Sequence, residues 1–183
     1  MDQEFNPKEI RLILGIGNPG ESYTRTYHNI GILFVSSLSE ALCPETKFKD
    51  HASGLFEYKR CLGALLARSL VFMNQSGKSA SRAQKLAGGE SDSMLIVHDD
   101  SDLAIGSYKL SFDRGSAGHH GIDSVVAALG TSEFWRLRIG IREPENSSSA
   151  GDFVLQKIAP DHEERFEKLF QELVGVVTSE KNS

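Results

Sequence analysis

Residues 11–20, RLILGIGNPG, join a short apolar run to a glycine-rich turn. The apolar run extends from residue 10 to residue 16 and is too short for a typical helix, so it predicts a buried strand. From residue 30 to residue 42, apolar side chains recur with helical spacing, and Asn29 stands where its side chain would cap the first turn. A buried strand followed by an amphipathic helix is typical of α/β proteins.

The rest of the chain repeats this alternation. We expect strands near residues 53–59, 63–71, 94–98, 108–112 and 135–142, and helices near residues 76–87, 122–129 and 166–177. A tight turn at Leu62 and Gly63 would join the first two of these strands, and residues 145–151, ENSSSAG, are typical of a flexible loop. With 183 residues, the chain is predicted to form one α/β domain over residues 1–183, a mixed, mostly parallel twisted sheet with helices on both faces.

The composition excludes several classes of protein. Hydrophobic residues make up 39% of the chain and charged residues 25%, which is typical of a globular domain and not of a disordered chain. No apolar run reaches the roughly 18 residues that a membrane span needs, and the first ten residues do not resemble a signal peptide. Cys43 and Cys61 lack the spacing of a metal site and suit a reducing compartment. We therefore expect a cytoplasmic protein with no membrane partner.

The net charge of −5 hides two opposite segments. Residues 58–89 contain six Lys and Arg residues and no acidic residue, whereas residues 90–102 contain five acidic residues and no Lys or Arg. Local patches, and not the mean charge, attract polyanions. A nucleic-acid partner is therefore compatible with an acidic chain.

The glycine pattern Gly15-x-Gly17-x-x-Gly20 follows the first strand, as in a dinucleotide-binding turn. That site needs a helix to begin at the second glycine, so that free N–H groups meet the pyrophosphate. Here Pro19 lacks an N–H, and the helical pattern begins only near Asn29. The pattern thus favours a tight turn over a nucleotide site.

Polar side chains follow three of the predicted strands. Asn18 follows the first strand, Asn74 follows the strand near residues 63–71, and Asp99 follows the strand at 94–98. If these strands are parallel, the three side chains meet at one edge of the sheet, and His28 could fold back among them. A histidine oriented by a carboxylate is a general base for water, and amides can stabilise an oxyanion. The alternative is that the asparagines are turn residues and His28 is a solvated loop residue.

Histidines and carboxylates also cluster in the sequence, at His98-Asp99-Asp100-x-Asp102 and at His119-His120. Adjacent residues of a strand point to opposite faces, so they cannot easily share one ion. No His-x-x-x-His pair is present. We therefore expect no metal and no other cofactor.

Basic side chains gather on three predicted elements. Lys78, Arg82 and Lys85 share one face of the helix at 76–87, opposite a face of alanines. Arginines 136, 138 and 142 share one face of the strand at 135–142. Between Lys109 and the helix near 122 lies a basic, glycine-rich loop that begins at Arg114, whose N–H groups could hold phosphate. Each face alone is typical of solvated surface, but together they favour a substrate that carries phosphate.

Taken together, these residues resemble the bacterial-type peptidyl-tRNA hydrolase family. The matching stretches occur in the family's order and are LILGIGNPGESYTRTYHNIG (12–31), FMNQSGKS (72–79), HDDSDLAIG (98–106), RGSAGHHG (114–121) and FWRLRIGI (134–141). The resemblance implies the family's fold and its reaction, metal-free cleavage of the ester between a peptide and the 3′ ribose of tRNA. The implied partner is peptidyl-tRNA, and the family precedent implies a monomer.

The resemblance also implies roles for single residues. His28 would be the general base and Asp99 its orienting partner, while Asn18 and Asn74 would position the peptide, the water or the developing oxyanion. The residues implied to contact substrate or tRNA are Tyr23, Asn74, Lys78, Arg82, Lys85, Lys109, Arg114, His120 and Arg138.

Three departures from the family pattern concern this surface. His120 replaces an asparagine, Ser111 replaces a lysine that clamps the tRNA end-phosphate, and Tyr27 replaces an arginine. An imidazole cannot copy the paired donor and acceptor of an amide, so we predict that His120 weakens catalysis or makes it more pH-dependent. The alternative function is a weakened or inactive RNA-binding relative with the same fold. A metal- or nucleotide-dependent enzyme is less favoured.

Overall fold

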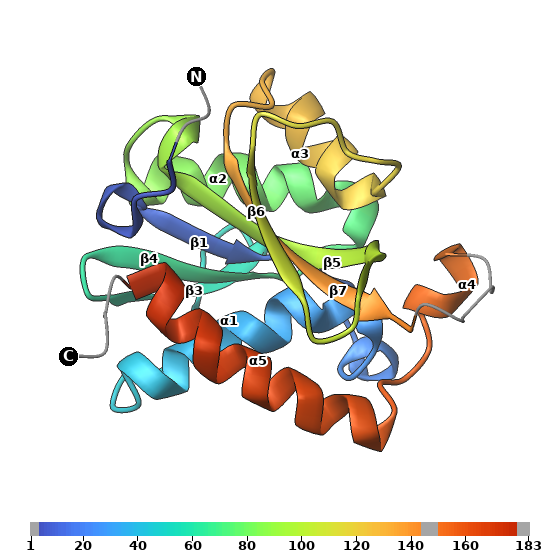
Figure 1. Cartoon of the computed structure of the whole chain (residues 1–183). Helices are drawn as coiled ribbons and strands as arrows, with labels where there is room; N and C mark the ends of the chain where they lie inside the picture. Colours follow the sequence, from blue (N-terminus) through green and yellow to red (C-terminus); the bar gives the residue numbers. More distant parts are fainter. Residues whose placement is uncertain (1–3, 144–149, 179–183) are drawn as a thin grey trace.

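A computed structural model describes residues 4–143 and 150–178 of the chain (Figure 1). Within these residues, seven strands form one sheet in the order β2-β3-β4-β1-β5-β7-β6. The central strands β4, β1, β5 and β7 are parallel, and the pairs at both edges are antiparallel. The strands are β1 (Leu12–Gly15), β2 (Lys49–Asp50), β3 (Phe56–Cys61), β4 (Ala64–Ser69), β5 (Met94–Ala104), β6 (Tyr108–Phe112) and β7 (Trp135–Arg142). The predicted α/β fold with a mixed sheet and a parallel centre is therefore confirmed.

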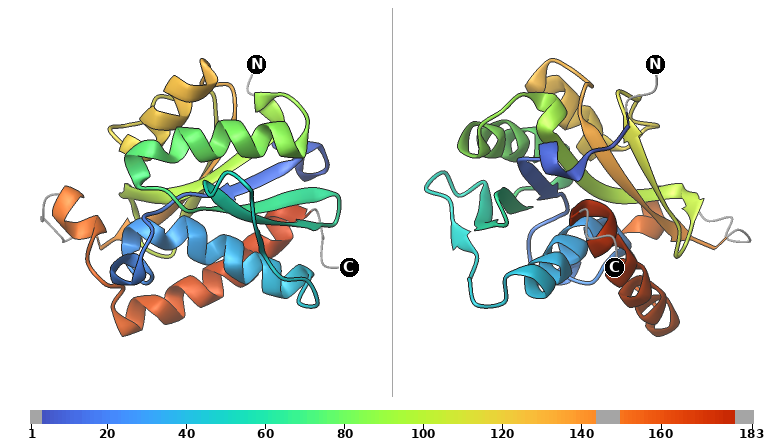
Figure 2. Two further views of the ribbon diagram at one scale, coloured as in Figure 1. Left: turned by 180° about the vertical axis from the view of Figure 1, so that it is seen from behind. Right: turned by 60° about the vertical axis from the view of Figure 1, so that its left-hand side comes forward.

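Helices cover both faces of this sheet, as Figures 1 and 2 show from three sides. One face is covered by α1 (Ile30–Leu42) and α5 (Pro160–Thr178), and the other by α2 (Ser76–Ala87) and α3 (His120–Leu129). The short α4 (Ala150–Val154) follows β7. Alternate residues of β1, β4 and β5 enter two separate apolar cores, one on each face, which explains the apolar runs in these strands, whereas β7 contributes to one core only. Among the described residues, no helix combines the length and the apolar character that a membrane span requires.

Close backbone approach fixes the start of α1 against the sheet. A Cβ on Gly15 would lie 2.4 Å from the carbonyl oxygen of Gly31, and a Cβ on Gly31 would lie 2.2 Å from that of Val97. Both glycines are therefore needed for α1 to begin directly beside the carboxyl ends of β1 and β5. Between β1 and α1 the chain forms two short 3₁₀ turns, Glu21–Tyr23 and Tyr27–Asn29, so no helix begins at the glycine pattern. The interpretation of that pattern as a turn is confirmed.

The structure corrects several sequence-based boundaries. Strand β5 continues past residue 98 to Ala104, and β2 and α4 were not expected. Most of the predicted loop at 145–151 lies outside the described residues, but its last two residues belong to α4. Asn29 does not cap α1, because its side chain accepts a hydrogen bond from Asn18 N and donates one to Asn18 O.

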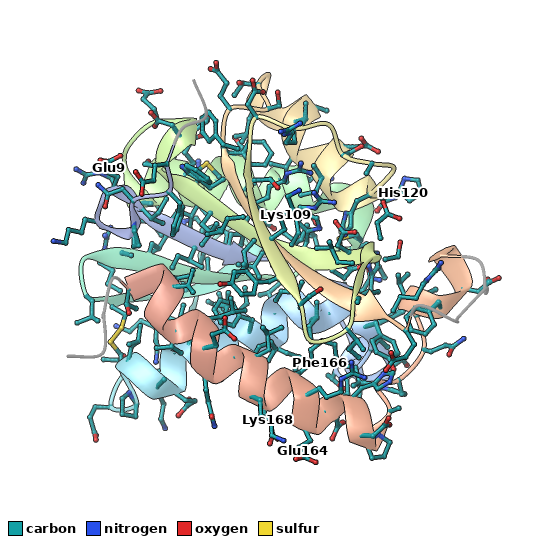
Figure 3. All side chains as sticks on the ribbon, in the orientation of Figure 1. Glu9, Lys109, His120, Glu164, Phe166 and Lys168 are labelled. Atoms are coloured by element: carbon teal, nitrogen blue, oxygen red, sulfur yellow. A yellow bond between two sulfur atoms is a disulfide. The ribbon has the colours of Figure 1, made fainter. Side chains whose placement is uncertain are left out.

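The far end of α1 is tied to β3. A disulfide joins Cys43, directly after α1, to Cys61, the last residue of β3 (Figure 3). The neighbouring Lys59 is buried and donates hydrogen bonds to three carbonyl oxygens, those of Ser39, Cys43 and Thr46. The disulfide was not predicted, and it runs against the interpretation that the two cysteines suit a reducing compartment. The cytoplasmic location stays a prediction.

Candidate active site

His28 and Asp99 meet at the carboxyl end of the parallel strands. His28 lies in the 3₁₀ turn that leads into α1, and its Nδ1 is 2.8 Å from Asp99 Oδ1. Asp99 belongs to β5, and because β1 ends at Gly15, opposite Val97, Asp99 extends beyond the end of its neighbour strand. The side chain of Asp99 is 3% exposed and that of His28 is 14% exposed. The sequence-based pairing of these two residues therefore matches the geometry.

A second histidine contacts the same carboxylate oxygen. His119 caps the N-terminus of α3: its Nδ1 accepts hydrogen bonds from Gly121 N at 3.1 Å and from Ile122 N at 3.3 Å. Nδ1 must then carry a lone pair, so the ring proton lies on Nε2. That Nε2–H donates to Asp99 Oδ1 at 3.1 Å. The helix cap thus fixes the tautomer of His119 as a hydrogen-bond donor to Asp99.

These contacts keep Asp99 ionised. Burial alone would raise the pKa of Asp99, but the nearby His119 and His28, and the hydrogen bonds from both, outweigh it and hold the pKa well below its usual range. An ionised Asp99 accepts the Nδ1–H of His28, which leaves the lone pair of His28 on Nε2. No hydrogen-bond partner of this Nε2 is found in the part of the chain that the structure describes. His28 and Asp99 both line a cavity of about 190 Å³.

His28, Asp99 and His119 could hold a metal ion by distance alone, because their ligand atoms all lie within 4.8 Å of one another. The hydrogen bonds that His119 makes oppose metal binding. To bind a metal through Nε2, His119 would have to move its proton to Nδ1, where two backbone N–H groups already donate. The donor set therefore suits proton transfer better than metal binding, in line with the sequence-based expectation of no metal.

His98 lies beside this group on the opposite face of β5 and does not add charge to it. Its ring contacts that of His119, with ring centroids 4.6 Å apart, and its Nδ1–H donates to the carbonyl of Asp99 at 2.7 Å. Burial, reinforced by His119, lowers the pKa of His98 well below its usual value, so this imidazole is neutral at pH 7.

The two predicted asparagines lie next to each other but outside this cavity. Asn18 Oδ1 accepts a hydrogen bond from Met73 N at 2.8 Å, which joins the turn after β1 to the segment that carries the exposed Asn74. Asn18 is also linked to His28 through Asn29, the next residue of the 3₁₀ turn. Tyr23 lies edge-on to Phe72, whose ring is half exposed, with ring centroids 6.5 Å apart. Asn18, Asn74 and Tyr23 therefore form a polar and aromatic surface connected to His28 through the backbone.

The predicted basic face of α2 is present. Lys78, Arg82 and Lys85 are exposed, whereas Ala80 and Ala83 are buried against the sheet. The exposed positions follow the predicted periodicity, so this part of the prediction is confirmed.

The predicted basic face of β7 is only partly exposed. Arg136 is 2% exposed, and burial together with the nearby Arg138 lowers its pKa to about 10. Arg138 pairs with Asp100, with Nε 2.5 Å from Oδ2, and lies opposite the exposed Lys109 of β6. The interpretation of β7 as an open basic surface was therefore wrong for Arg136, because this side chain is buried on the face of the sheet that α2 and α3 cover.

The loop before α3 ends in two engaged N–H groups. Those of Gly121 and Ile122 already bond to His119, so these two are not free to hold phosphate, and phosphate binding by the rest of the loop stays a prediction. Arg114 and His120 are exposed, and His120 projects from the start of α3 at the rim of the cavity (Figure 3).

His119 is the functional residue that the sequence analysis missed. Its position directly before an apolar helix run is a cap signal, but its contact with Asp99 depends on how α3 packs beside β5. Such a tertiary contact between residues 20 positions apart leaves no local pattern.

Comparisons with known proteins agree on one family. The family model described as peptidyl-tRNA hydrolase matches residues 12–181. A peptidyl-tRNA hydrolase of Aquifex aeolicus is 32% identical over 169 residues, which cover 91% of this chain and 87% of that protein. One from Psychrobacter arcticus is 39% identical over 160 residues, with 84% and 80% covered.

Solved structures give the same result. The crystal structure of peptidyl-tRNA hydrolase from Acinetobacter baumannii superimposes with a TM-score of 0.81 and 27% identity, and the match covers 96% of this chain and 92% of that one. A complex of peptidyl-tRNA hydrolase with N-propanol gives a TM-score of 0.83 at 27% identity, with 96% and 90% covered.

Proposed function

This chain belongs to the peptidyl-tRNA hydrolase family, and we propose that it hydrolyses the ester bond of peptidyl-tRNA with His28 as the general base. The observation that carries this proposal is the shared oxygen of Asp99, which accepts from both His28 and His119. One histidine is locked as a donor by a helix cap, and the other lines a cavity and is left with a lone pair on Nε2. A base held in this way can activate water.

In the proposed reaction, His28 Nε2 takes a proton from a water molecule, and the water oxygen attacks the ester carbonyl carbon. The imidazolium that forms is stabilised by the ionised Asp99, to which its Nδ1–H donates. When the tetrahedral intermediate collapses, the bond to the 3′ oxygen of the ribose breaks. The proton on Nε2 passes to that oxygen, which gives the free 3′ hydroxyl of tRNA and a peptide carboxylic acid, and the acid then loses its proton to solvent to become the carboxylate.

We assign the surface of Asn18, Asn74 and Tyr23 to the peptide and the ester carbonyl. Asn18 uses its side-chain oxygen to bond Met73 N, which leaves its amide N–H₂ as the group that can donate to an oxyanion. The exposed Asn74 lies one residue away.

The tRNA would contact exposed side chains on the α2 and α3 face of the sheet. The cations are Lys78, Arg82 and Lys85 on α2, Lys109 on β6 and Arg114 in the loop before α3, and the imidazole of His120 lies at the cavity rim. Arg138, which is paired with Asp100, would add its remaining N–H groups. Contacts to an A-form acceptor stem are mostly with phosphate and ribose, so this surface selects shape more than sequence. The protein is proposed to act as a monomer.

The test is release of free tRNA from an N-blocked aminoacyl-tRNA by the wild type and by His28→Ala, with a chelator present. We expect a loss of kcat of about 10²–10⁴-fold in the variant, which is what a general base contributes, and no effect of the chelator. Unchanged turnover by His28→Ala would refute the role of His28. Loss of wild-type activity on chelation would instead favour a metal-dependent reaction.

The same experiment decides the alternative, an RNA-binding relative without activity. Such a protein would show no turnover in the wild type and would bind tRNA equally well before and after the His28→Ala substitution. The intact His28–Asp99 pair favours the enzyme, because a binding protein has no need of an oriented base.

A further inference from the structure

Tyr27, the residue before the proposed base, is buried against the C-terminal part of the chain. Its side chain is 2% exposed, and its ring stacks on Phe153 of α4 with ring centroids 4.5 Å apart. Phe166 of α5 lies at its edge. These contacts alone would be served equally well by phenylalanine.

The hydroxyl of Tyr27 has its own partners. Its oxygen is 2.6 Å from His162 Nδ1 and accepts a hydrogen bond from Ala159 N at 3.3 Å. An oxygen that accepts the Ala159 N–H can still donate its proton to the imidazole nitrogen. His162 is 12% exposed, and its Nε2 lies 3.5 Å from Glu143 after β7 and 3.7 Å from Asp161 on its own helix. Tyr27 is therefore the inner end of a polar chain that reaches from the core to the surface.

Backbone hydrogen bonds join the same two segments. Tyr27 N donates to Gln156 O, Ile158 N donates to Arg25 O, and Thr26 forms an isolated antiparallel bridge with Lys157. The turn that carries His28 is thus held from behind by residues 156–162. On the other side, the His28 side chain contacts Asp99 and the ring of His119.

The segment behind Tyr27 also reaches the cavity. Gly151 and Val154 of α4 line it together with His28, while Phe153 of the same helix stacks on Tyr27. The position of the base and one wall of the cavity therefore depend on the same tyrosine.

We propose that Tyr27 and His162 are positioning residues of the hydrolase: their hydrogen bond holds the turn of His28 so that the imidazole stays against Asp99. The proposal rests on the role of His28 given above. A buried tyrosine hydroxyl that bonds to Ala159 N and His162 stabilises one placement of the turn. A displacement of the turn by about 1 Å would reduce turnover without removing a reacting group.

The experiment compares Tyr27→Phe, His162→Leu and the double variant. For each single variant we expect kcat per folded molecule to fall about tenfold with KM unchanged, as expected for misplaced catalytic groups. The double variant should be no slower than either single one, because both remove the same hydrogen bond. His162→Asn places an amide near the position of Nδ1 and should restore most of the activity.

Tyr108→Phe is the matched control. It also removes a tyrosine hydroxyl that bonds to α5, at Glu172, but it has no link to the His28 turn, so kcat should not change. The proposal is overturned if Tyr27→Phe keeps kcat within about twofold of the wild type, or if the two losses multiply. If Tyr27→Phe does not fold, His162→Leu and His162→Asn alone decide the matter. Full activity of His28→Ala would refute the proposed function itself, whereas an inactive His28→Ala with an unaffected Tyr27→Phe would refute only this inference.

Discussion

The two ends of helix α1 are held by different kinds of contact. At its N-terminal end, the turn before α1 places His28 against Asp99, and the contacts are single hydrogen bonds at the edge of a cavity. At its C-terminal end, Lys59 donates to three carbonyls and a disulfide joins Cys43 to Cys61. The first end positions groups that must react, and the second ties the end of the helix and the segment after it to β3. Changes at the first end should therefore cost activity, and changes at the second end should cost stability.

The largest effect is expected at the N-terminal end from Asp99→Asn. An amide cannot stabilise the imidazolium and can hold His28 in the wrong tautomer, so kcat should fall by about 10³–10⁴-fold. The variant also loses the stabilisation that ionised Asp99 provides, so its thermal midpoint at pH 7, measured by circular dichroism, should fall, but it should stay folded at room temperature. A variant that unfolds at room temperature would show that Asp99 serves mainly the fold.

At the C-terminal end, replacing both Cys43 and Cys61 by serine should lower the free energy of unfolding by about 3 kcal/mol, because the unfolded chain loses a covalent loop. The kcat of the folded variant should equal that of the wild type. Urea unfolding measures the first quantity, and the wild type treated with dithiothreitol should behave like the variant. Reduced activity in the variant under native conditions would contradict the division between the two ends.

Lys59→Met should have the next largest effect. It removes the lysine donor from three carbonyl oxygens, of which those of Ser39 and Cys43 keep a backbone N–H donor, and the loss of these hydrogen bonds costs about 2 kcal/mol in total after the lysine's own desolvation is recovered. Urea unfolding measures this loss, and turnover should be unchanged. Lys47→Met, at an exposed position of the same segment, is the control and should leave stability unchanged.

Acid should weaken the N-terminal end selectively. Because the pKa of folded Asp99 lies well below its ordinary value, its ionisation stabilises the fold above about pH 4, and this contribution is lost as the pH falls from there toward the folded pKa. The loss amounts to about 1.4 kcal/mol per pH unit. Between pH 5 and pH 2, the free energy of unfolding should therefore fall more steeply with decreasing pH in the wild type than in Asp99→Asn. Equal slopes would mean that Asp99 is not held ionised.

The smallest effect is expected from His120→Asn at the cavity rim. An amide restores a paired donor and acceptor that an imidazole lacks, so we expect kcat/KM to rise a few-fold (about 1 kcal/mol or less) and its pH profile to flatten. Steady-state hydrolysis from pH 5.5 to pH 8.5 measures both quantities. An unchanged rate and pH profile would show that the residue at this position does not affect the reaction.

Much of the fold follows from local patterns. The boundaries of α2 and β6 match the periodicity, because a stripe of alanines and an alternating strand are complete within their own residues. The hairpin at Leu62 and Gly63 was also predicted, and both residues have the positive φ that such a turn requires. The two-residue β2 and the short α4 carry too few residues to produce a period.

The candidate site was predictable only in part. Asp99 could be placed at this edge because parallel strands end there, and the family resemblance paired it with His28, a loop residue. The role of His119 depends on the packing of α3, and the pairing of Cys43 with Cys61 depends on where α1 ends beside β3. For Asn29, a local signal gave a wrong prediction: the residue stands at a cap position, but its side chain bonds to Asn18 in the neighbouring turn.

The most direct test of the account is a double-mutant cycle on kcat with His28→Ala, Asp99→Asn and both together. If the two residues act as one unit, the double variant is about as slow as His28→Ala alone, since Asp99 has no role without the base. If the two losses multiply, Asp99 acts independently of His28, and the central claim that it orients the base is contradicted.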